Sequence, residues 1–194
     1  NMKHYMGLIL GSLLSASAMA DTPSYNFVQA GYVNADYADL QPFDLIGFEV
    51  QASAALTEAF FTTGRFRMVD DTISAYKLEE TNWQVSIGYQ MPYGKDTVFD
   101  VRVNYGDIAF DYTEPEGKFN DSASHYSVSS HARHMLTEDI EVYAGLEWQL
   151  WKKGSDQKAY RLGSMYNFSD LAVGVEYVKY SDSSAYTLFA RYNF

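Results

Sequence analysis

The stretch that decides the fold is residues 82–90, which read NWQVSIGYQ. Large apolar side chains at Trp83, Val85 and Ile87 alternate with small or polar ones. Strict alternation is typical of a β-strand whose two faces meet different surroundings. The same period of two recurs along the rest of the chain, so we predict ten strands, over 24–35, 43–55, 59–69, 80–91, 97–107, 123–136, 140–151, 159–168, 171–180 and 185–194.

The composition excludes several protein classes. The chain has 194 residues, a net charge of −11, 47% hydrophobic residues, 16% aromatic residues and no cysteine. The length fits a single domain, and an acidic chain lacks the basic face that a nucleic-acid binder needs. The lack of cysteine excludes disulfides, thiol nucleophiles and cysteine-ligated zinc. We therefore expect no cofactor, no metal site and no nucleic-acid partner.

The N-terminal segment has the pattern of an export signal. A short basic start at Lys3 and His4 precedes an apolar stretch over 6–14. Ala18 and Ala20 then place small residues where a signal peptidase needs them. The apolar stretch is too short for a membrane anchor helix, which is the alternative. We predict a secretory signal peptide over 1–20.

The connections between the predicted strands alternate in length. An even number of strands with short turns at one end and longer loops at the other is the layout of an outer-membrane barrel. We therefore predict one antiparallel up-and-down transmembrane β-barrel over residues 21–194, with about ten strands and eight as the alternative. The short connections lie near 56–58, 92–96, 137–139 and 169–170, and the longer ones near 36–42, 70–79, 108–122 and 152–158.

The two kinds of basic residue indicate which face of the strands is enclosed. All six arginines fall within strands, on the polar face, whereas the lysines fall in connections or at strand ends. A solvated face, as in a soluble lipocalin-like barrel, would carry lysine. An enclosed lumen suits guanidinium groups that pair with carboxylates. The predicted lumen charge network is Glu49, Arg65, Arg67, Asp100, Arg102, Arg133, Glu147, Arg161, Glu176 and Arg191.

The aromatic residues of the apolar face collect near the strand ends, with aliphatic side chains between them. Two aromatic girdles around an aliphatic band match a bilayer, because amphipathic rings prefer its interfaces. A soluble core has no reason to sort side chains in this way. The girdle at the loop end comprises Trp83, Tyr105, Tyr126, Trp148, Tyr160, Tyr177 and Tyr186, and that at the turn end comprises Tyr89, Phe99, Tyr166, Phe168, Tyr192 and Phe194.

Three segments resemble one known family. Residues 24–32, 83–89 and 136–144 look like the first strand, a middle strand and a late hairpin of small OmpA/OmpX-type outer-membrane β-barrels, also labelled porin-family or OmpA-like barrel proteins. The likeness extends over the chain from residue 21, although small members usually have eight strands. It implies the outer membrane of a Gram-negative cell envelope, lipid and lipopolysaccharide as surroundings, and a monomer. It also implies that the terminal Phe194 is read by the barrel-assembly machinery.

The sequence offers only weak candidates for catalysis. His125 and Ser127 share the lumen face, and with Asp139 and Glu141 they are faintly similar to the active site of a lipid A deacylase barrel. Asp70 and Asp71 could supply half of an omptin-type protease site, but no Asp-x-His motif supplies the other half. The histidines at 131 and 134 lie on opposite faces of a strand, which disfavours a metal site. We expect no enzyme, with a lipid A-modifying barrel as the exception.

The predicted loops carry most of the remaining charge. Paired charges inside a narrow barrel favour a closed lumen, so we expect a structural or surface-interaction role through acidic extracellular loops. The alternatives are a narrow porin-like channel for small ions or solutes and, third, an outer-membrane enzyme. Carboxylates in the loops could bind lipopolysaccharide through divalent cations, and loop lysines could contact lipid phosphates directly. The acidic residues are Asp70, Asp71, Glu79, Glu80, Asp107, Asp111, Glu114, Glu116 and Asp121, and the lysines are Lys152, Lys153 and Lys158.

Overall fold

A computed structural model describes residues 23–194, so the predicted signal peptide and its cleavage residues Ala18 and Ala20 lie outside the described residues. The described chain is almost entirely strand, with one short 3-10 helix at Ala38–Leu40. The strands are β1 (Phe27–Tyr37), β2 (Leu45–Ala55), β3 (Phe60–Ile73), β4 (Tyr76–Tyr93), β5 (Thr97–Glu114), β6 (Gly117–Met135), β7 (Ile140–Trp151), β8 (Gln157–Phe168), β9 (Leu171–Lys179) and β10 (Ser183–Asn193).

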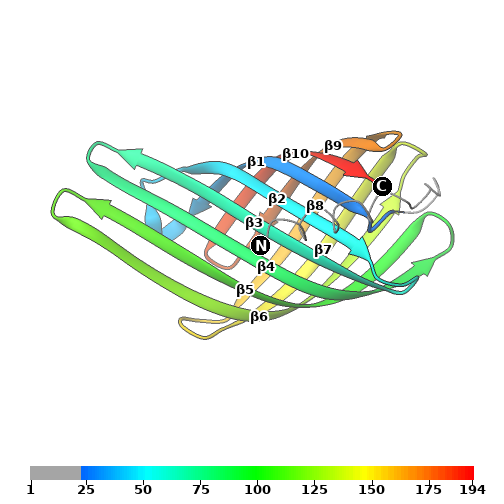
Figure 1. Ribbon diagram of the computed structural model, residues 1–194, viewed down its shortest axis with the longest axis horizontal. Coiled ribbons are helices and arrows are strands. Elements are labelled where there is room, and N and C mark those ends of the chain that lie inside the picture. Colours follow the sequence, from blue (N-terminus) through cyan, green and yellow to red (C-terminus); the bar gives the residue numbers. More distant parts are fainter. Residues whose placement is uncertain (1–22) are drawn as a thin grey trace, which may run out of the picture.

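The ten strands form a closed antiparallel barrel in which each strand pairs with its neighbours in sequence (Figure 1). The first and last strands complete the ring, with Ala30 of β1 opposite Ala190 of β10. The prediction of an all-β, ten-strand barrel is confirmed, and the alternative of eight strands is wrong. No helix within residues 23–194 is long and apolar enough to cross a membrane.

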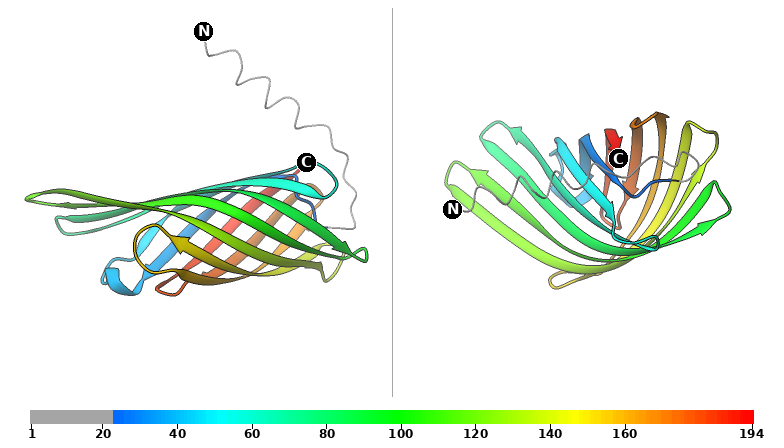
Figure 2. Two further views of the ribbon diagram at one scale, coloured as in Figure 1. Left: turned by 90° about the horizontal axis from the view of Figure 1, so that it is seen from below. Right: turned by 45° about the vertical axis from the view of Figure 1, so that its right-hand side comes forward.

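The connections predicted as long loops over 70–79 and 108–122 are instead continuations of the strands. β3 and β4 meet in a turn of two residues at Ser74, whose φ of 58° is left-handed, and β5 and β6 meet across Pro115 and Glu116. The expectation was wrong because the pattern inverts in these segments: the outward face becomes polar, as at Asp70 and Asp111, while Leu78 and Phe110 lie inward, and the backbones still pair. The two hairpins project beyond the rest of the barrel (Figure 2).

β4, β5 and β6 are much longer than a membrane crossing requires. They contain 18, 18 and 19 residues, whereas a tilted strand crosses a bilayer in about 9–11 residues. The end of the barrel from which the two hairpins project is called the loop end. The opposite end, which carries the shorter turns and both described termini, is called the turn end. The outer parts of these hairpins therefore lie in water.

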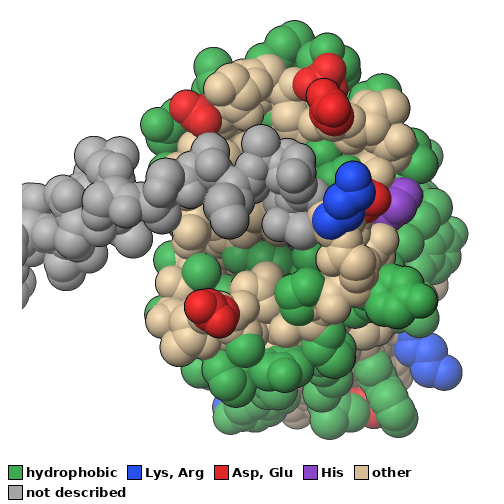
Figure 3. All heavy atoms as spheres, turned by 90° about the vertical axis from the view of Figure 1, so that its right-hand side faces the viewer, with side chains coloured by type: hydrophobic (Ala, Val, Ile, Leu, Met, Phe, Trp, Pro, Cys, Tyr) green, Lys and Arg blue, Asp and Glu red, His purple; other side chains and the backbone are tan. Residues whose placement is uncertain are grey.

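The outer wall is apolar and the inner wall is polar. Ile87, Val103 and Leu146 point outward with 62%, 64% and 66% of their surface exposed, while Asp100 and Glu80 point inward and are 1% and 0% exposed. At the turn end, hydrophobic side chains line the outer edge (green in Figure 3). A soluble barrel would have the reverse arrangement, so the lipocalin-like alternative does not hold.

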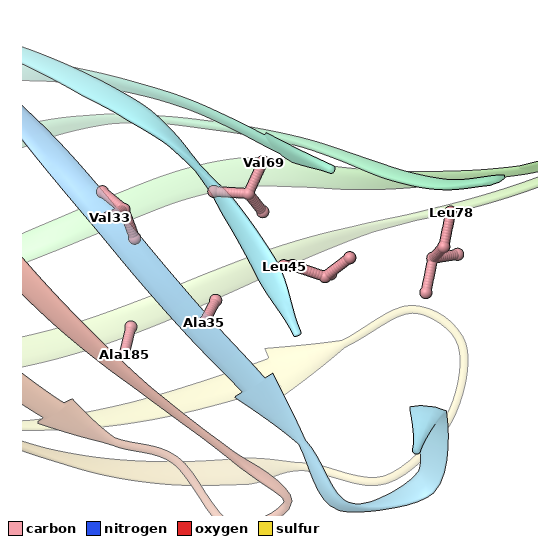
Figure 4. Packing of buried hydrophobic residues seen from close by; sticks show 6 residues of the cluster. All are labelled: Val33, Ala35, Leu45, Val69, Leu78 and Ala185. Carbon is pink, nitrogen blue, oxygen red and sulfur yellow. The ribbon is translucent and has the colours of Figure 1, made fainter. Parts of the chain in front are cut away.

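One apolar cluster lies inside the barrel towards the loop end. It is formed by six buried residues from five strands, with the partly buried rings of Tyr37 and Phe110 packed against it. Its members lie on the inward faces of their strands, so the interior towards this end is partly apolar. The six residues are Val33, Ala35, Leu45, Val69, Leu78 and Ala185 (Figure 4).

A glycine allows one ring to lie flat against the inner wall. A Cβ atom on Gly163 of β8 would lie 2.1 Å from the ring of Tyr143 on β7. We expect Gly163→Val to lower the free energy of unfolding by about 1–3 kcal/mol, because the added side chain overpacks the lumen. Urea titration of the protein in vesicles measures this, with Gly64→Ala as the control, since nothing lies within 4 Å of a Cβ at Gly64. Equal stability of the two variants would contradict the expectation.

Candidate functional site: the barrel lumen

The lumen holds six guanidinium and six carboxylate groups. Each lies on the inward face of its strand and is buried or nearly so. Equal numbers of opposite charges allow the interior to be neutral although the chain as a whole is acidic. The groups are Arg65, Arg67, Arg102, Arg133, Arg161 and Arg191 with Glu49, Glu80, Asp100, Glu141, Glu147 and Glu176.

At the turn end the residues before β1 fold into the mouth of the barrel. Tyr25 is 3% exposed, and its hydroxyl donates to Asp100 Oδ2 at 2.7 Å. Its ring packs on that of Phe61, with centroids 4.1 Å apart. Arg133 donates to the carbonyl oxygen of Ser24 at 2.7 Å. This segment therefore plugs the turn end. The alternating pattern of the sequence does not predict this contact.

Asp100 organises the charges behind this plug. Arg102 donates to both of its oxygens, Nε to Oδ1 at 2.7 Å and Nη2 to Oδ2 at 2.9 Å. Nδ1 of His131 lies 3.0 Å from Oδ1. Nearby, Arg133 forms a two-point pair with Glu141 at 2.6 and 3.1 Å. Each oxygen of the buried carboxylates thus has a donor, which offsets the cost of removing the charge from water.

The middle of the lumen contains a second layer of pairs. Arg161 donates to Glu176, which also accepts from the Tyr143 hydroxyl at 2.9 Å. Arg65 donates to Gln84 at 2.9 Å and lies 4.0 Å from Glu49. These contacts join neighbouring strands, except that of Tyr143 on β7, which reaches Glu176 on β9 over the strand between them. The layer therefore ties adjacent parts of the wall together.

A third pair closes the layer nearest the loop end. Arg67 donates through Nε and Nη2 to Oε1 of Glu80, at 2.9 and 2.6 Å, and Tyr37 donates to Oε2 at 2.6 Å. The sequence analysis assigned Glu80 to an acidic loop, which was wrong. Glu49 lies directly opposite Arg67 in the strand register, but the ion pair of Arg67 is with Glu80. The period of two from Ser86 back through Asn82 is the signal that could have placed Glu80 inside.

Within residues 23–194 Arg191 forms no ion pair with a carboxylate. It donates through Nε and Nη2 to Oε1 of Gln29, at 2.9 and 2.8 Å. Its guanidinium carbon lies 3.8 Å from the centroid of Phe27 and 5.6 Å from that of Phe189. Stacking between rings is an arrangement that guanidinium tolerates and ammonium does not share. This contact shows why a lumen position takes arginine in place of lysine.

Little open space remains between these layers. The cavity among the middle side chains has a volume of about 70 Å³, and it is lined by five of the arginines, including Arg65 and Arg161. A water molecule occupies about 30 Å³ in the liquid. This cavity is therefore well below the roughly 300–1,000 Å³ of typical small-molecule sites.

The weak catalytic candidates of the sequence do not come together. His125 is 1% exposed and stacks on Trp151 at 4.4 Å, and neither ring nitrogen has a hydrogen-bond partner within residues 23–194. Ser127 donates to Glu147 at 2.6 Å, and Glu141 pairs with Arg133 near the turn end. Asp70 lies 3.4 Å from Lys77 in the projecting hairpin. Within the described residues no group of three His, Cys, Asp or Glu side chains could hold a metal.

The predicted loop-end girdle lies on the outer wall and runs further round the barrel than predicted. Ring centroids are 5.6 Å apart for Trp83 and Tyr105, and 5.0 Å for Tyr105 and Tyr126. Tyr177 and Tyr186 continue it at 4.7 Å. The sequence analysis missed three outward aromatics, which give β1, β2 and β3 one ring each at this level: Tyr32, Phe48 and Phe66.

The turn-end girdle is less regular. Tyr166 and Phe168 lie 4.6 Å apart and Tyr93 and Phe99 lie 6.3 Å apart, while Phe60, which was not predicted, contacts Tyr89 at 5.2 Å. β6 and β7 place Ala132 and Val142 at the corresponding outward positions. The predicted members Tyr192 and Phe194 lie at the end of the chain beside β1. The rings therefore cover part of this rim.

Buried and exposed ion pairs should differ in their contribution to stability. We expect Glu80→Gln to lower the free energy of unfolding by about 3–5 kcal/mol, because it leaves the guanidinium of Arg67 buried without a counter-charge. Replacing both residues, as Arg67→Met with Glu80→Leu, should recover most of that loss. The control is Lys118→Ala, which breaks the exposed pair with Asp111 and should cost less than about 1 kcal/mol. Unfolding in urea measures all three, and a double variant no more stable than Glu80→Gln would contradict this account.

Comparison with known proteins agrees with the fold. A family model described as the outer membrane protein beta-barrel domain matches residues 6–178. A search of curated proteins finds no match.

Three solved structures illustrate the likeness. The NanC porin superimposes with a TM-score of 0.56 and 8% identity, over 86% of this chain and all of its own. The KdgM porin in complex with disordered oligogalacturonate gives 0.51 and 12%, over 86% and 99%. The translocator domain of the autotransporter NalP from Neisseria meningitidis gives 0.51 and 8%, over 97% and 93%. At such identities the likeness shows the fold alone.

Proposed function

This chain belongs to the outer membrane protein β-barrel domain family, and we propose that it is a barrel with a closed lumen that acts at the cell surface through its loop end. The observation that carries the proposal is the contrast between the two parts of the molecule. The middle of the lumen has a cavity of only about 70 Å³, whereas β3–β6 extend well beyond the membrane as two hairpins.

The closed lumen is supported at three levels. Tyr25 plugs the turn end, the pair of Arg161 and Glu176 lies on the wall of the middle, and the pair of Arg67 and Glu80 lies nearest the loop end. Each contact holds charged or hydroxyl groups by hydrogen bonds that water in a conducting pore would have to replace. Large aqueous channels are found in barrels with 16 or more strands. A structural barrel therefore fits better than a channel.

The proposed surface role is supported by the exposed carboxylates of the two hairpins. In outer-membrane barrels the shorter turns face the periplasm and the longer connections face the outside, which places both hairpins outside the cell. The β5–β6 hairpin carries Asp111, Glu114, Glu116 and Asp121 against Lys118. These exposed carboxylates suit Mg²⁺ or Ca²⁺ held jointly with an anionic partner. The lipopolysaccharide that would surround the barrel is such a partner.

The remaining parts of the proposal concern export, assembly and chemistry. Residues 1–20 would direct export, and Phe194 would be read by the assembly machinery. The protein would act as a monomer, without a cofactor and without an enzymatic activity. The separation of His125 from Glu147 and Ser127 into different contacts supports the last point.

A conductance measurement tests the closed lumen. In planar bilayers we expect no single-channel steps from the native protein, because the pairs leave no continuous water path. Opening all three levels, by Tyr25→Ser with Arg161→Ser and Glu176→Ser and with Arg67→Ser and Glu80→Ser, should produce steps. The control is Tyr89→Phe on the outer wall. Reproducible steps from the native protein would overturn the proposal in favour of a narrow channel for small ions or solutes, a function that its likeness in fold to two porins keeps open.

A shortened hairpin tests the surface role. Deleting residues 110–121 and joining Ala109 to Ser122, which face each other across the ladder, through an Asn-Gly turn removes four carboxylates and one lysine. We expect lipopolysaccharide to bind the variant in phospholipid nanodiscs at least about tenfold more weakly in the presence of Mg²⁺. Chelation of Mg²⁺ should weaken lipopolysaccharide binding by the native protein to the same extent. Binding that survives both changes would refute the bridged contact and favour direct contact through Lys152, Lys153 and Lys158.

A further inference from the structure

A second, larger cavity lies at the loop end, outside the charged layers of the lumen. Its volume is about 490 Å³, within the usual range of 300–1,000 Å³ for small-molecule sites. The inward faces of the strands form its walls, and the connections over 152–156 and 180–182 form its rim. It lies above the pair of Arg67 and Glu80, so it opens towards the loop end and not into the middle of the barrel.

Four aromatic rings line this cavity. Tyr37 and Phe110 pack edge to face, with centroids 5.5 Å apart, and Trp151 and Tyr180 line the same space. Trp151 is held in place, because its indole N–H donates to Gln149 at 3.1 Å and its ring stacks on His125. The electron-rich faces of aromatic rings attract organic cations. The cavity therefore presents a fixed apolar wall that favours a positive charge.

Two buried oxygens in the same walls lack a donor. Asn82 is 8% exposed, and its Oδ1 has no hydrogen-bond partner within residues 23–194. Oδ1 of Asp182 is likewise buried and unpaired in that part of the chain, although Oδ2 accepts from Gln157 at 2.5 Å. Both unpaired atoms are acceptors. Each of these atoms has almost no surface open to the cavity, so an N–H donor of a ligand reaches it after a rotation of the terminal group about χ2, and that contact would relieve the cost of the unmet acceptor.

The charges around the cavity favour a positively charged ligand. Three carboxylates line it, those of Asp39, Asp156 and Asp182, and none of them forms an ion pair within residues 23–194. The two cations in its walls are already engaged, Arg67 by Glu80 and Lys153 by Asp121 at 3.0 Å. An anionic ligand would meet uncompensated carboxylates. A cation would meet them as partners.

We propose that this cavity binds a small organic compound with a primary ammonium group. The ammonium group donates to Asp182 and Asn82, and the carbon chain lies against Trp151 and Tyr37. The walls are inward-facing residues, so the ligand enters from the aqueous phase at the loop end and not from the lipid side. The site is independent of the hairpin contact with lipopolysaccharide and of whether the middle of the lumen conducts.

Calorimetric titration with three compounds of similar length tests the proposal. The probes are 1,4-diaminobutane, 1,4-butanediol and succinate, which are positive, neutral and negative at pH 7. With the purified protein in detergent, we expect the diamine to bind at least about tenfold more tightly than the diol. We expect no binding of succinate.

Two variants and a matched control locate the contact. Asp182→Asn keeps the volume and removes the charge, and Asn82→Leu removes the unpaired acceptor. Each should weaken diamine binding by at least about tenfold. Asp170→Asn makes the same charge change in the turn between β8 and β9, at the opposite end of the barrel, and should leave binding unchanged. Heat-modifiable migration in gels verifies that each variant is folded.

Each result bears directly on the proposal. Tight binding of the diamine that both folded variants weaken would support it. Equal binding of the diamine and the diol would overturn it, as would diamine binding that Asp182→Asn leaves unchanged. A native protein that takes up no diamine at millimolar concentration would overturn it as well. The conductance and lipopolysaccharide experiments have separate readouts, so their failure does not affect this test.

Discussion

The pairing of β1 with β10 is the constraint on which the rest of the structure depends. A bilayer offers no water to hydrogen-bond a free strand edge, so a sheet can cross it only as a closed ring. The pairing runs along the whole of both strands, from Phe27 opposite Asn193 to Tyr37 opposite Ser183. Closure gives every strand two neighbours and divides the side chains into an outer and an inner set. All later features follow from that division.

The inner set then has to solve an electrostatic problem in a space too narrow for bulk water. Charges removed from water are tolerated when they have partners and further hydrogen bonds. Five of the six guanidiniums here lie within 4.0 Å of a carboxylate, and Arg191 is held by Gln29 and two aromatic rings instead. Arginine fits because one group can bond two oxygens, as Arg133 does with Glu141, or lie between rings, as Arg191 does. The same pairs that make the interior neutral also fill it, so stability and closure have one origin.

The constraint relaxes where the strands leave the membrane. β3–β6 continue as hairpins whose outward face is polar, because no lipid demands an apolar outer side there. Inside this end, the charged layers give way to the apolar cluster around Val33 and Leu45 and then to the cavity beside Trp151. The two ends of the barrel therefore differ in kind. The turn end is sealed by Tyr25, and the loop end has a space that a small molecule could enter.

The sequence by itself determined the features that depend on the period of two. The ten strands, the polar lumen with Arg102 and Arg161, and the outward rings of Trp83 and Tyr186 all follow from position along a strand. Only the tertiary structure decided which groups meet. The partner of Arg67 is Glu80 and not Glu49, Tyr25 reaches Asp100, and His125 stacks on Trp151 away from Ser127. The reason is physical: alternation fixes the face on which a side chain lies, whereas its contacts depend on strand register and on the curvature that brings distant strands together across the lumen.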